Sequence, residues 1–200
     1  IFVVFLIVVL GIYYTLNDRL KIWFLLAMSY VFYGFWDPQL CLLILLSTVV
    51  DYSCGRRIGA LPVDQRRRHG KPWLWLSLAV NLGLLGFFKY TDFFIAEFIH
   101  AAGWLGMALD ADRYLLHLVL PAGVSFYTFQ TMAYTIDLYR GRCAPERNLG
   151  RFALFVGFFP QLVAGPIVRA VDFLPQTAEI PYVTRDQVSR AFWLISIGLF

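Results

Sequence analysis

Polar side chains recur at a regular spacing in one apolar segment of the chain. If residues 122–139 are helical, four of these side chains fall within about 80° of one another on the helix surface. They are Tyr127, Gln130, Tyr134 and Asp137. Phenol, amide and carboxyl groups donate or accept hydrogen bonds, so a cluster of them can hold a polar reactant or bond helices together. Because such a stripe is costly toward lipid, we predict that it faces other helices or a watery cavity.

A second segment, residues 152–168, is apolar but is interrupted by Pro160, Gly165 and Pro166. Backbone that is not helical survives at membrane depth only where protein or water satisfies its amide groups. Basic residues flank the segment on both sides. We therefore interpret it as re-entrant, entering a membrane from the cytoplasmic side and returning there, with a plain crossing as the alternative.

The composition indicates the class of protein that must position these groups. Hydrophobic residues make up 60% of the chain and charged residues 15%, and the mean hydropathy is +0.65. A soluble domain is nearer half apolar and a quarter charged. The predicted fold class is all-α, a polytopic transmembrane helical bundle with interfacial and re-entrant helices. The basic residues gather in short loops and form no face interleaved with aromatic residues, so we expect no nucleic-acid partner.

The three cysteines predict neither a disulfide framework nor a metal site. Cys41 and Cys54 lie in one apolar run, and on one helix they would be about 20 Å apart, beyond disulfide reach. Cys143 stands alone in a basic loop, and no zinc-type spacing occurs. We expect ordinary thiols and no bound metal.

Apolar runs along the chain predict the membrane spans. They are residues 1–16, 22–36, 39–54, 72–88, 115–139 and a last run from 191. The arginine-rich loop of residues 55–71 belongs in the cytoplasm by the positive-inside rule. That orientation also places the loops 17–21, 140–151 and 169–190 on the cytoplasmic side. Residues 93–109, broken by polar residues, predict a helix that lies in the outer interface.

The chain divides into two parts in this interpretation. Residues 1–110 hold the N-terminal transmembrane helices and the interfacial helix, and residues 111–200 begin a core that carries the polar stripe and the interrupted segment. The chain starts without a methionine and stops inside an apolar run at Phe200. We therefore expect it to be a fragment of a longer protein.

Three strings in the second half carry a family resemblance. They are Leu-Pro-Ala-Gly-Val-Ser-Phe-Tyr-Thr-Phe-Gln (120–130), Tyr-Thr-Ile-Asp-Leu-Tyr-Arg-Gly (134–141) and Phe-Phe-Pro-Gln-Leu-Val-Ala-Gly-Pro-Ile-Val-Arg (158–169). Supporting strings occur at 32–38 and 81–90. In this order they resemble the signature of membrane-bound O-acyltransferases, in particular the bacterial alginate O-acetyltransferase-like branch.

The resemblance implies an enzyme of the bacterial inner membrane. Such an enzyme passes an acyl group, here expected to be acetyl, from a cytoplasmic donor such as acetyl-coenzyme A to hydroxyls of an exported polysaccharide such as alginate. It implies no bound cofactor, and it implies extracytoplasmic acetyltransferase proteins as partners. The family's catalytic histidine is expected beyond Phe200, and His69, His100 and His117 match no family motif. The fragment is therefore expected to be inactive alone.

The resemblance also suggests what the polar side chains contribute. A sugar hydroxyl attacks only as a base removes its proton, and the resulting oxyanion needs fixed donors in a dry site. The candidates for lining that path are Ser125, Tyr127, Gln130, Tyr134 and Asp137, with Gln161 and Arg169 guiding the donor at the cytoplasmic mouth. The alternatives are hydrogen bonds that hold the helices together for the stripe, an ion pair with Arg140 for Asp137, and a topology anchor for Arg169.

Other functions fit some of the same features. Broken apolar segments with buried polar groups also occur in transporters and flippases. Within the resembling family, transfer of D-alanine to teichoic acid is an alternative to acetylation. A scaffold subunit without chemistry of its own is a third possibility.

Overall fold

The computed structural model describes residues 2–35, 38–104, 111–116, 123–178 and 183–199. Every regular element in these ranges is a helix, as the composition predicts. The helices are α1 (Phe2–Thr15), α2 (Asp18–Gly34), α3 (Pro38–Gly59), α4 (Val63–His69), α5 (Lys71–Trp104), α6 (Ala111–Tyr114), α7 (Val124–Tyr139), α8 (Leu149–Gly157), α9 (Phe159–Ala164), α10 (Ala170–Ala178) and α11 (Arg185–Leu199).

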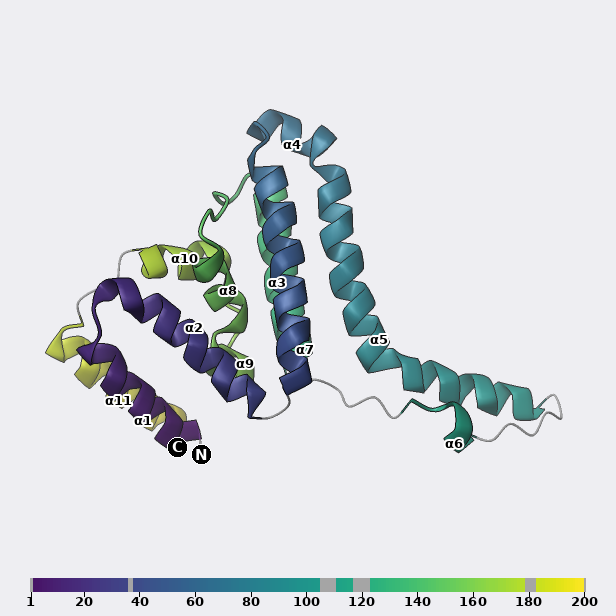
Figure 1. Ribbon diagram of the computed structural model, residues 1–200, viewed down its shortest axis with the longest axis horizontal. Coiled ribbons are helices and arrows are strands. Elements are labelled where there is room, and N and C mark those ends of the chain that lie inside the picture. Colours follow the sequence, from purple (N-terminus) through teal and green to yellow (C-terminus); the bar gives the residue numbers. More distant parts are fainter. Residues whose placement is uncertain (1, 36–37, 105–110, 117–122, 179–182, 200) are drawn as a thin grey trace.

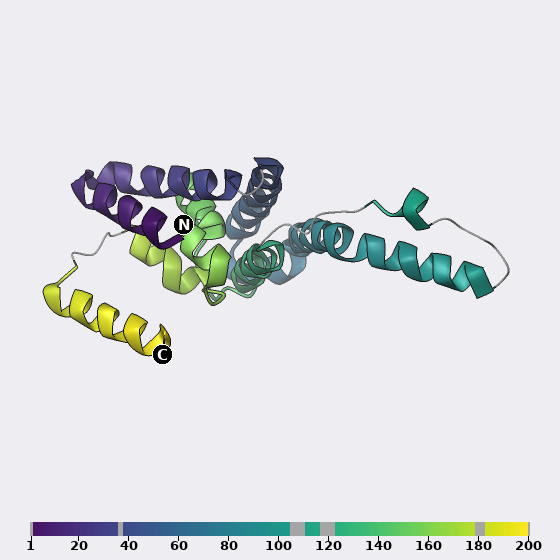
Figure 2. The same cartoon turned by 90° about the horizontal axis from the view of Figure 1, so that it is seen from below.

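Three helices that are distant in the sequence pack side by side in the centre of the molecule. These are α3, the first half of α5, and α7 (Figure 1). α8 packs against α2 and α3 and is buried along most of its length. α1 lies against α2, whereas α11 is exposed and stands apart from the other helices (Figure 2). The predicted stripe therefore lies on α7, which packs against α3 and α5 and also contacts α8.

The first three predicted runs become α1, α2 and α3 with shifted ends. The predicted polar loop at 17–21 is wrong, because α2 already begins at Asp18. An acidic residue in the first helical turn complements the helix dipole, and Lys21 Nζ lies 2.8 Å from the Asp18 carboxylate three residues earlier.

The basic segment 55–71 is helical rather than a loop. α3 continues to Gly59, with Arg56 and Arg57 in its last turn, and α4 follows. Arg66 is buried, and its Nη1 donates to the carbonyl oxygen of Leu138 at 2.9 Å. Cations and donors stabilise the carbonyl groups at a helix C-terminus. One of the arginines predicted to be solvated thus caps α7.

α5 corrects the prediction of a crossing helix followed by a separate interfacial helix. It is one continuous helix of 34 residues. Its ribbon bends so that the second half leaves α3 and α7 and extends away from them (Figure 1). Residues 105–109 of the predicted interfacial helix lie outside the described residues. Among the residues that the structure describes, α5 is the one helix both long and apolar enough to cross a membrane.

α7 is shorter than the predicted run 115–139, whose residues 117–122 lie outside the described ranges. Its N-cap is Gly123, with a φ of 77°. A side chain there would be strained, and its Cβ would lie 2.8 Å from the Tyr33 hydroxyl. Glycine therefore allows the start of α7 to approach α2 closely.

The segment predicted to be re-entrant is interrupted twice, at Phe158 and between Ala164 and Ala170. α8 begins directly after the loop that follows α7. α10 then packs against α8 and borders the same loop, at residues 142–146. The chain thus returns to the end of α7 from which it came. The charged loop predicted at 169–190 is wrong, because α10 and the start of α11 occupy much of it.

Candidate functional site at the interrupted helix

The break between α8 and α9 leaves two backbone groups to be satisfied. Phe158 is extended, with φ −61° and ψ 109°, so the amide of Phe159 turns away from the carbonyl oxygen of Phe155. Gln130 Nε2 on α7 donates to that carbonyl oxygen at 2.7 Å. The amide of Phe159 donates to Ser29 Oγ on α2 at 3.3 Å. Side chains of two other helices therefore hold the break open.

Two of the predicted site residues meet at this break. Gln130 Nε2 also lies 3.2 Å from Gln161 Oε1, which α9 carries one turn after the interruption. Pro160 occupies the first turn of α9, where its missing amide hydrogen costs nothing. At Gly165 a Cβ atom would lie 2.6 Å from the Gln161 Cα, so glycine is needed for the close return of the chain. The break thus positions a pair of amide side chains inside the bundle.

Tyr127 lies about one helical turn before Gln130 on α7 and is buried. Its side chain is 1% exposed, and its Oη has no hydrogen-bond partner among the described residues. Buried hydroxyls nearly always find partners, and leaving one unpaired costs about 1–3 kcal/mol. Tyr127 is therefore the predicted residue whose hydroxyl is most available to a ligand.

Tyr134 is occupied by the protein itself. Its hydroxyl accepts a hydrogen bond from the amide of Glu146 at 3.1 Å. Its ring lies 4.9 Å from the ring of Phe152, centroid to centroid. These contacts hold the following loop and α8 against α7, as the helix-bonding alternative predicts.

The remaining predicted residues lie away from the break. Asp137 is mostly buried and faces Arg142, whose Nη1 is 3.9 Å from its Oδ1, so the expected pair with Arg140 is wrong. Ser125 is half-buried in the first turn of α7. Arg169 is exposed just before α10, and the described contacts include no hydrogen bond between it and Gln161.

A second polar cluster was missed by the sequence reasoning. It joins α3, α5 and α7 through Asp51, which is fully buried. Ser77 Oγ donates to Asp51 Oδ1 at 2.6 Å, and Asn81 Nδ2 donates to both carboxylate oxygens at 2.9 and 2.8 Å. Thr131 Oγ1 donates to Asn81 Oδ1 at 3.2 Å. We call these residues, with Ser47 and Thr135, the Asp51 cluster.

The sequence did contain a signal for the Asp51 cluster. Each of the three helices contributes two polar residues spaced by four, which places both on one helical face. The pairs are Ser47 and Asp51, Ser77 and Asn81, and Thr131 and Thr135. A carboxylate in an apolar run is also exceptional by itself and should have been paired with partners.

Comparison with known proteins finds relatives that are named as O-acetylating enzymes. The chain is 42% identical over 172 residues to the probable alginate O-acetylase AlgI of Pseudomonas aeruginosa, and 40% identical over 172 residues to that of Azotobacter vinelandii. It is 32% identical over 206 aligned residues to the peptidoglycan O-acetyltransferase of Helicobacter pylori. These relatives are named as O-acetylating enzymes, which confirms the resemblance to membrane-bound O-acyltransferases predicted from the sequence.

The match covers most of this chain but a minor part of each relative. It includes 86% of the chain and 32% of the Pseudomonas aeruginosa protein, 86% and 34% for Azotobacter vinelandii, and 90% and 37% for Helicobacter pylori. The chain therefore spans about a third of the length of these O-acyltransferases. No family model matches it, and no solved structure is significantly similar to it.

The histidines of this chain lie outside the interrupted helix. His69 ends α4 and is exposed, and His100 is exposed on the projecting half of α5. His117 lies outside the described residues. Cys143, in the loop after α7, is partly buried, and this burial raises the pKa of its thiol to about 11. These residues offer no base at the break.

Proposed function

We propose that this chain is part of a polytopic O-acyltransferase of the bacterial inner membrane. The enzyme passes an acetyl group from a cytoplasmic donor such as acetyl-coenzyme A to hydroxyls of an exported polysaccharide such as alginate. The observation that carries the proposal is the 42% identity to a probable alginate O-acetylase over 172 residues. Extracytoplasmic acetyltransferase proteins complete the pathway as partners in this proposal.

The surface of the molecule supports a multi-pass arrangement. Large apolar side chains are exposed along α1, α5 and α11, for instance Ile7 at 64%, Phe98 at 67% and Ile197 at 69%. Exposed apolar surface of this extent is rare on soluble proteins and is favourable toward lipid. The basic residues of α4 and of the loop after α7 lie at one end of the central helices, which we assign to the cytoplasm (Figure 1).

The interrupted helix supplies the polar interior that such chemistry needs. In this proposal the amides of Gln130 and Gln161 and the hydroxyl of Tyr127 border the passage where the acyl group changes carrier. Fixed donors in a water-poor site stabilise the oxyanion of the tetrahedral intermediate. The proton of the attacking hydroxyl passes to a base outside this segment, expected to be a histidine in a later apolar segment of the whole protein.

The experiment uses the whole protein in a strain that lacks its own copy. Replacing the histidine of the later segment by alanine should leave the amount of membrane-inserted protein unchanged and abolish acetylation of the exported polymer. Full acetylation by that variant would refute the proposal. Transport by the purified protein without turnover of the acyl donor would support a flippase instead.

The identity of the acceptor and of the acyl group can be tested in the same strain. One relative is named for peptidoglycan rather than alginate, so both polymers are assayed for ester-linked acetate. Release of D-alanine from purified cell-wall polymer would favour the alternative of D-alanyl transfer.

A further inference from the structure

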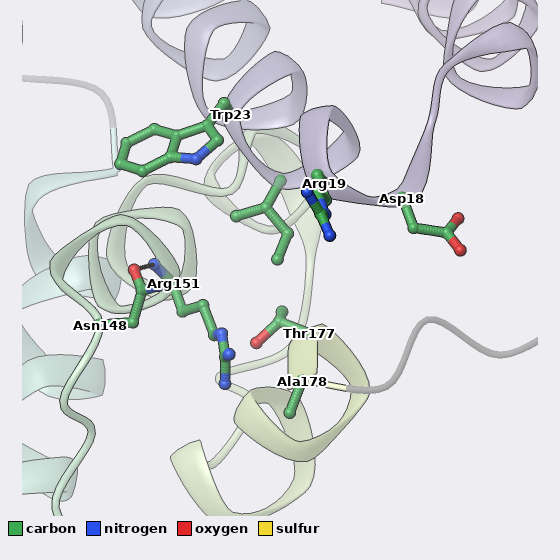
Figure 3. Close-up of a pocket in the computed structure, with 8 residues that line it drawn as sticks. Asp18, Arg19, Trp23, Asn148, Arg151, Thr177 and Ala178 are labelled. Atoms are coloured by element: carbon green, nitrogen blue, oxygen red, sulfur yellow. Dashed lines mark hydrogen bonds between the residues drawn. The ribbon is translucent and has the colours of Figure 1, made fainter.

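A polar pocket opens between the start of α2, the start of α8 and the end of α10. Its volume is about 400 Å³. Figure 3 shows Arg19 of α2 and Arg151 of α8 reaching into it, with Thr177 of α10 between them. Each of the three elements comes from a segment assigned to the cytoplasmic side. The pocket is therefore accessible from the cytoplasm in the proposed orientation.

The two arginines give the pocket the character of an anion site. Arg151 Nε is buried and has no hydrogen-bond partner in the described part of the chain. The carboxylate of Asp18, at the rim, is bonded to Lys21 Nζ at 2.8 Å and points away from Arg151 in Figure 3. Guanidinium groups bind phosphate oxygens in a fixed, two-pronged geometry. A phosphate group matches these donors.

Trp23 forms the wall on the other side of the pocket. Its ring lies directly over Gly150, where a Cβ atom would be 2.8 Å from the ring carbon Cη2. The same ring also lines a second cavity of about 350 Å³ between α2, α3 and α8, whose lining is almost wholly apolar. Trp23 thus stands at the junction of a polar pocket and an apolar slot.

The apolar slot ends near the interrupted helix. Tyr30 lines the slot, and it also borders a small void with Ser29, Tyr33 and Gly157 at the end of α8. Ser29 is the residue that accepts the amide of Phe159 at the break. A ligand with a charged head in the polar pocket would therefore direct a narrow apolar arm toward the buried hydroxyl of Tyr30.

We propose that the polar pocket binds the phosphate of an amphiphile whose narrow arm occupies the apolar slot. Two sources share this chemistry: a soluble acyl donor that carries a phosphorylated pantetheine arm, and an anionic phospholipid. The first source rests on the proposed function, whereas the second does not. Binding is measured without acyl transfer, so this inference and the proposed function can fail separately.

The test measures binding to the whole protein in nanodiscs of zwitterionic lipid. The probes are radiolabelled coenzyme A, adenosine 3′,5′-bisphosphate, which lacks the arm, and dihexanoyl phosphatidic acid. Arg151→Gln and Arg19→Gln should each weaken the binding of the phosphate probe roughly tenfold or more, as loss of a charge-assisted hydrogen bond does. Arg68→Gln, at an exposed arginine of α4, is the matched control and should change nothing.

A variant in the apolar slot distinguishes binding of the ligand's phosphate head from binding of its apolar arm. Ala27 is exposed and lines the slot, so Ala27→Leu fills it without disturbing a packed core. It should weaken coenzyme A or phosphatidic acid several-fold and leave the armless bisphosphate unchanged. Coenzyme A binding that depends on both arginines identifies the donor, and phosphatidic acid binding alone identifies a lipid headgroup. Failure of all probes to bind, or arginine variants that bind like the unmodified protein, would overturn the inference.

Discussion

α7 borders two polar clusters that differ in how completely they are satisfied. On the side of α3 and α5, the hydrogen bonds of the Asp51 cluster run from one member to the next. On the side of α2, α8 and α9, Gln130 is bonded to a backbone carbonyl, and the hydroxyl of Tyr127 has no partner among the described residues. A satisfied network rigidifies a bundle, whereas an unsatisfied group leaves capacity for a ligand. The first cluster thus holds the helices and the second can serve the reaction.

The largest effect should come from breaking the satisfied cluster. Asp51→Ala leaves the donors of Ser77 and Asn81 without their acceptor inside the bundle. Each unpaired buried donor costs about 1–3 kcal/mol, so we expect a loss of about 3 kcal/mol in the free energy of unfolding. The melting temperature of the purified whole protein and its amount in membranes should both fall. Asp64→Ala, at an exposed carboxylate of α4, is the control. Normal stability of Asp51→Ala would show that the cluster does not stabilise the packing of α3, α5 and α7.

Gln130→Leu should affect stability and transfer together. The change removes the donor to the carbonyl oxygen of Phe155 and the contact with Gln161. We expect a loss of about 1–3 kcal/mol in stability, because that carbonyl is left unpaired, and at least a tenfold loss of acetylation. Acetate content of the exported polymer is measured at equal amounts of membrane protein. An unaltered acetate content would place the reaction elsewhere.

Tyr127→Phe should affect acetyl transfer without lowering stability. Removing a hydroxyl that bonds nothing in the described structure should change stability by less than about 1 kcal/mol, or raise it. If the hydroxyl contacts a reactant, transfer should fall about tenfold. Tyr134→Phe is the matched comparison, because its hydroxyl accepts the amide of Glu146 and its loss should lower stability instead. If Tyr127→Phe lowered stability and Tyr134→Phe lowered transfer, the structural role would belong to Tyr127 and the role in the reaction to Tyr134.

The smallest effect concerns the loop that follows α7. Because burial raises the pKa of the Cys143 thiol to about 11, this thiol stays protonated at pH 8. The thiolate is the reactive form, so maleimide labelling should be slow at pH 8 and accelerate as the pH rises toward 11.

An introduced Pro62→Cys, at an exposed position before α4, should react rapidly once cells are permeabilised and resist an impermeant reagent in intact cells. Labelling of intact cells at position 62 would reverse the orientation.

The sequence predicted the elements whose signal is local. The all-helical class, the interruption of the segment 152–168, and the inward orientation of Tyr127, Gln130 and Tyr134 follow from hydropathy, backbone chemistry and helical spacing, and the structure has all of them. The first break lies at Phe158 rather than at Pro160, which is in the first turn of α9. The bounds of α2 and α4 were wrong, because charged residues in those segments were taken for loops although Asp18 pairs with Lys21 and Arg66 caps α7.

The rest could not be predicted because it depends on contacts between distant segments. Nothing local shows that Gln130 meets Gln161, or that Arg66 caps α7 across 72 residues of sequence. The Asp51 cluster had a local signal, because its polar residues are spaced by four. The polar residues of α3 and α5 were not considered as a site, because the predicted site was restricted to residues 120–169. Tyr134 had the same spacing as its neighbours on the stripe, and only the position of Glu146 shows that its hydroxyl is already used.

The two bonds that hold the gap between α8 and α9 also set an order of assembly. One comes from Ser29 and the other from Gln130, and both residues precede the gap in the chain. During synthesis α2 and α7 therefore exist before residues 155–159 leave the ribosome. The two backbone groups at the gap can therefore form their hydrogen bonds as soon as the newly made segment packs against α2 and α7, and they need not remain unpaired inside the bundle.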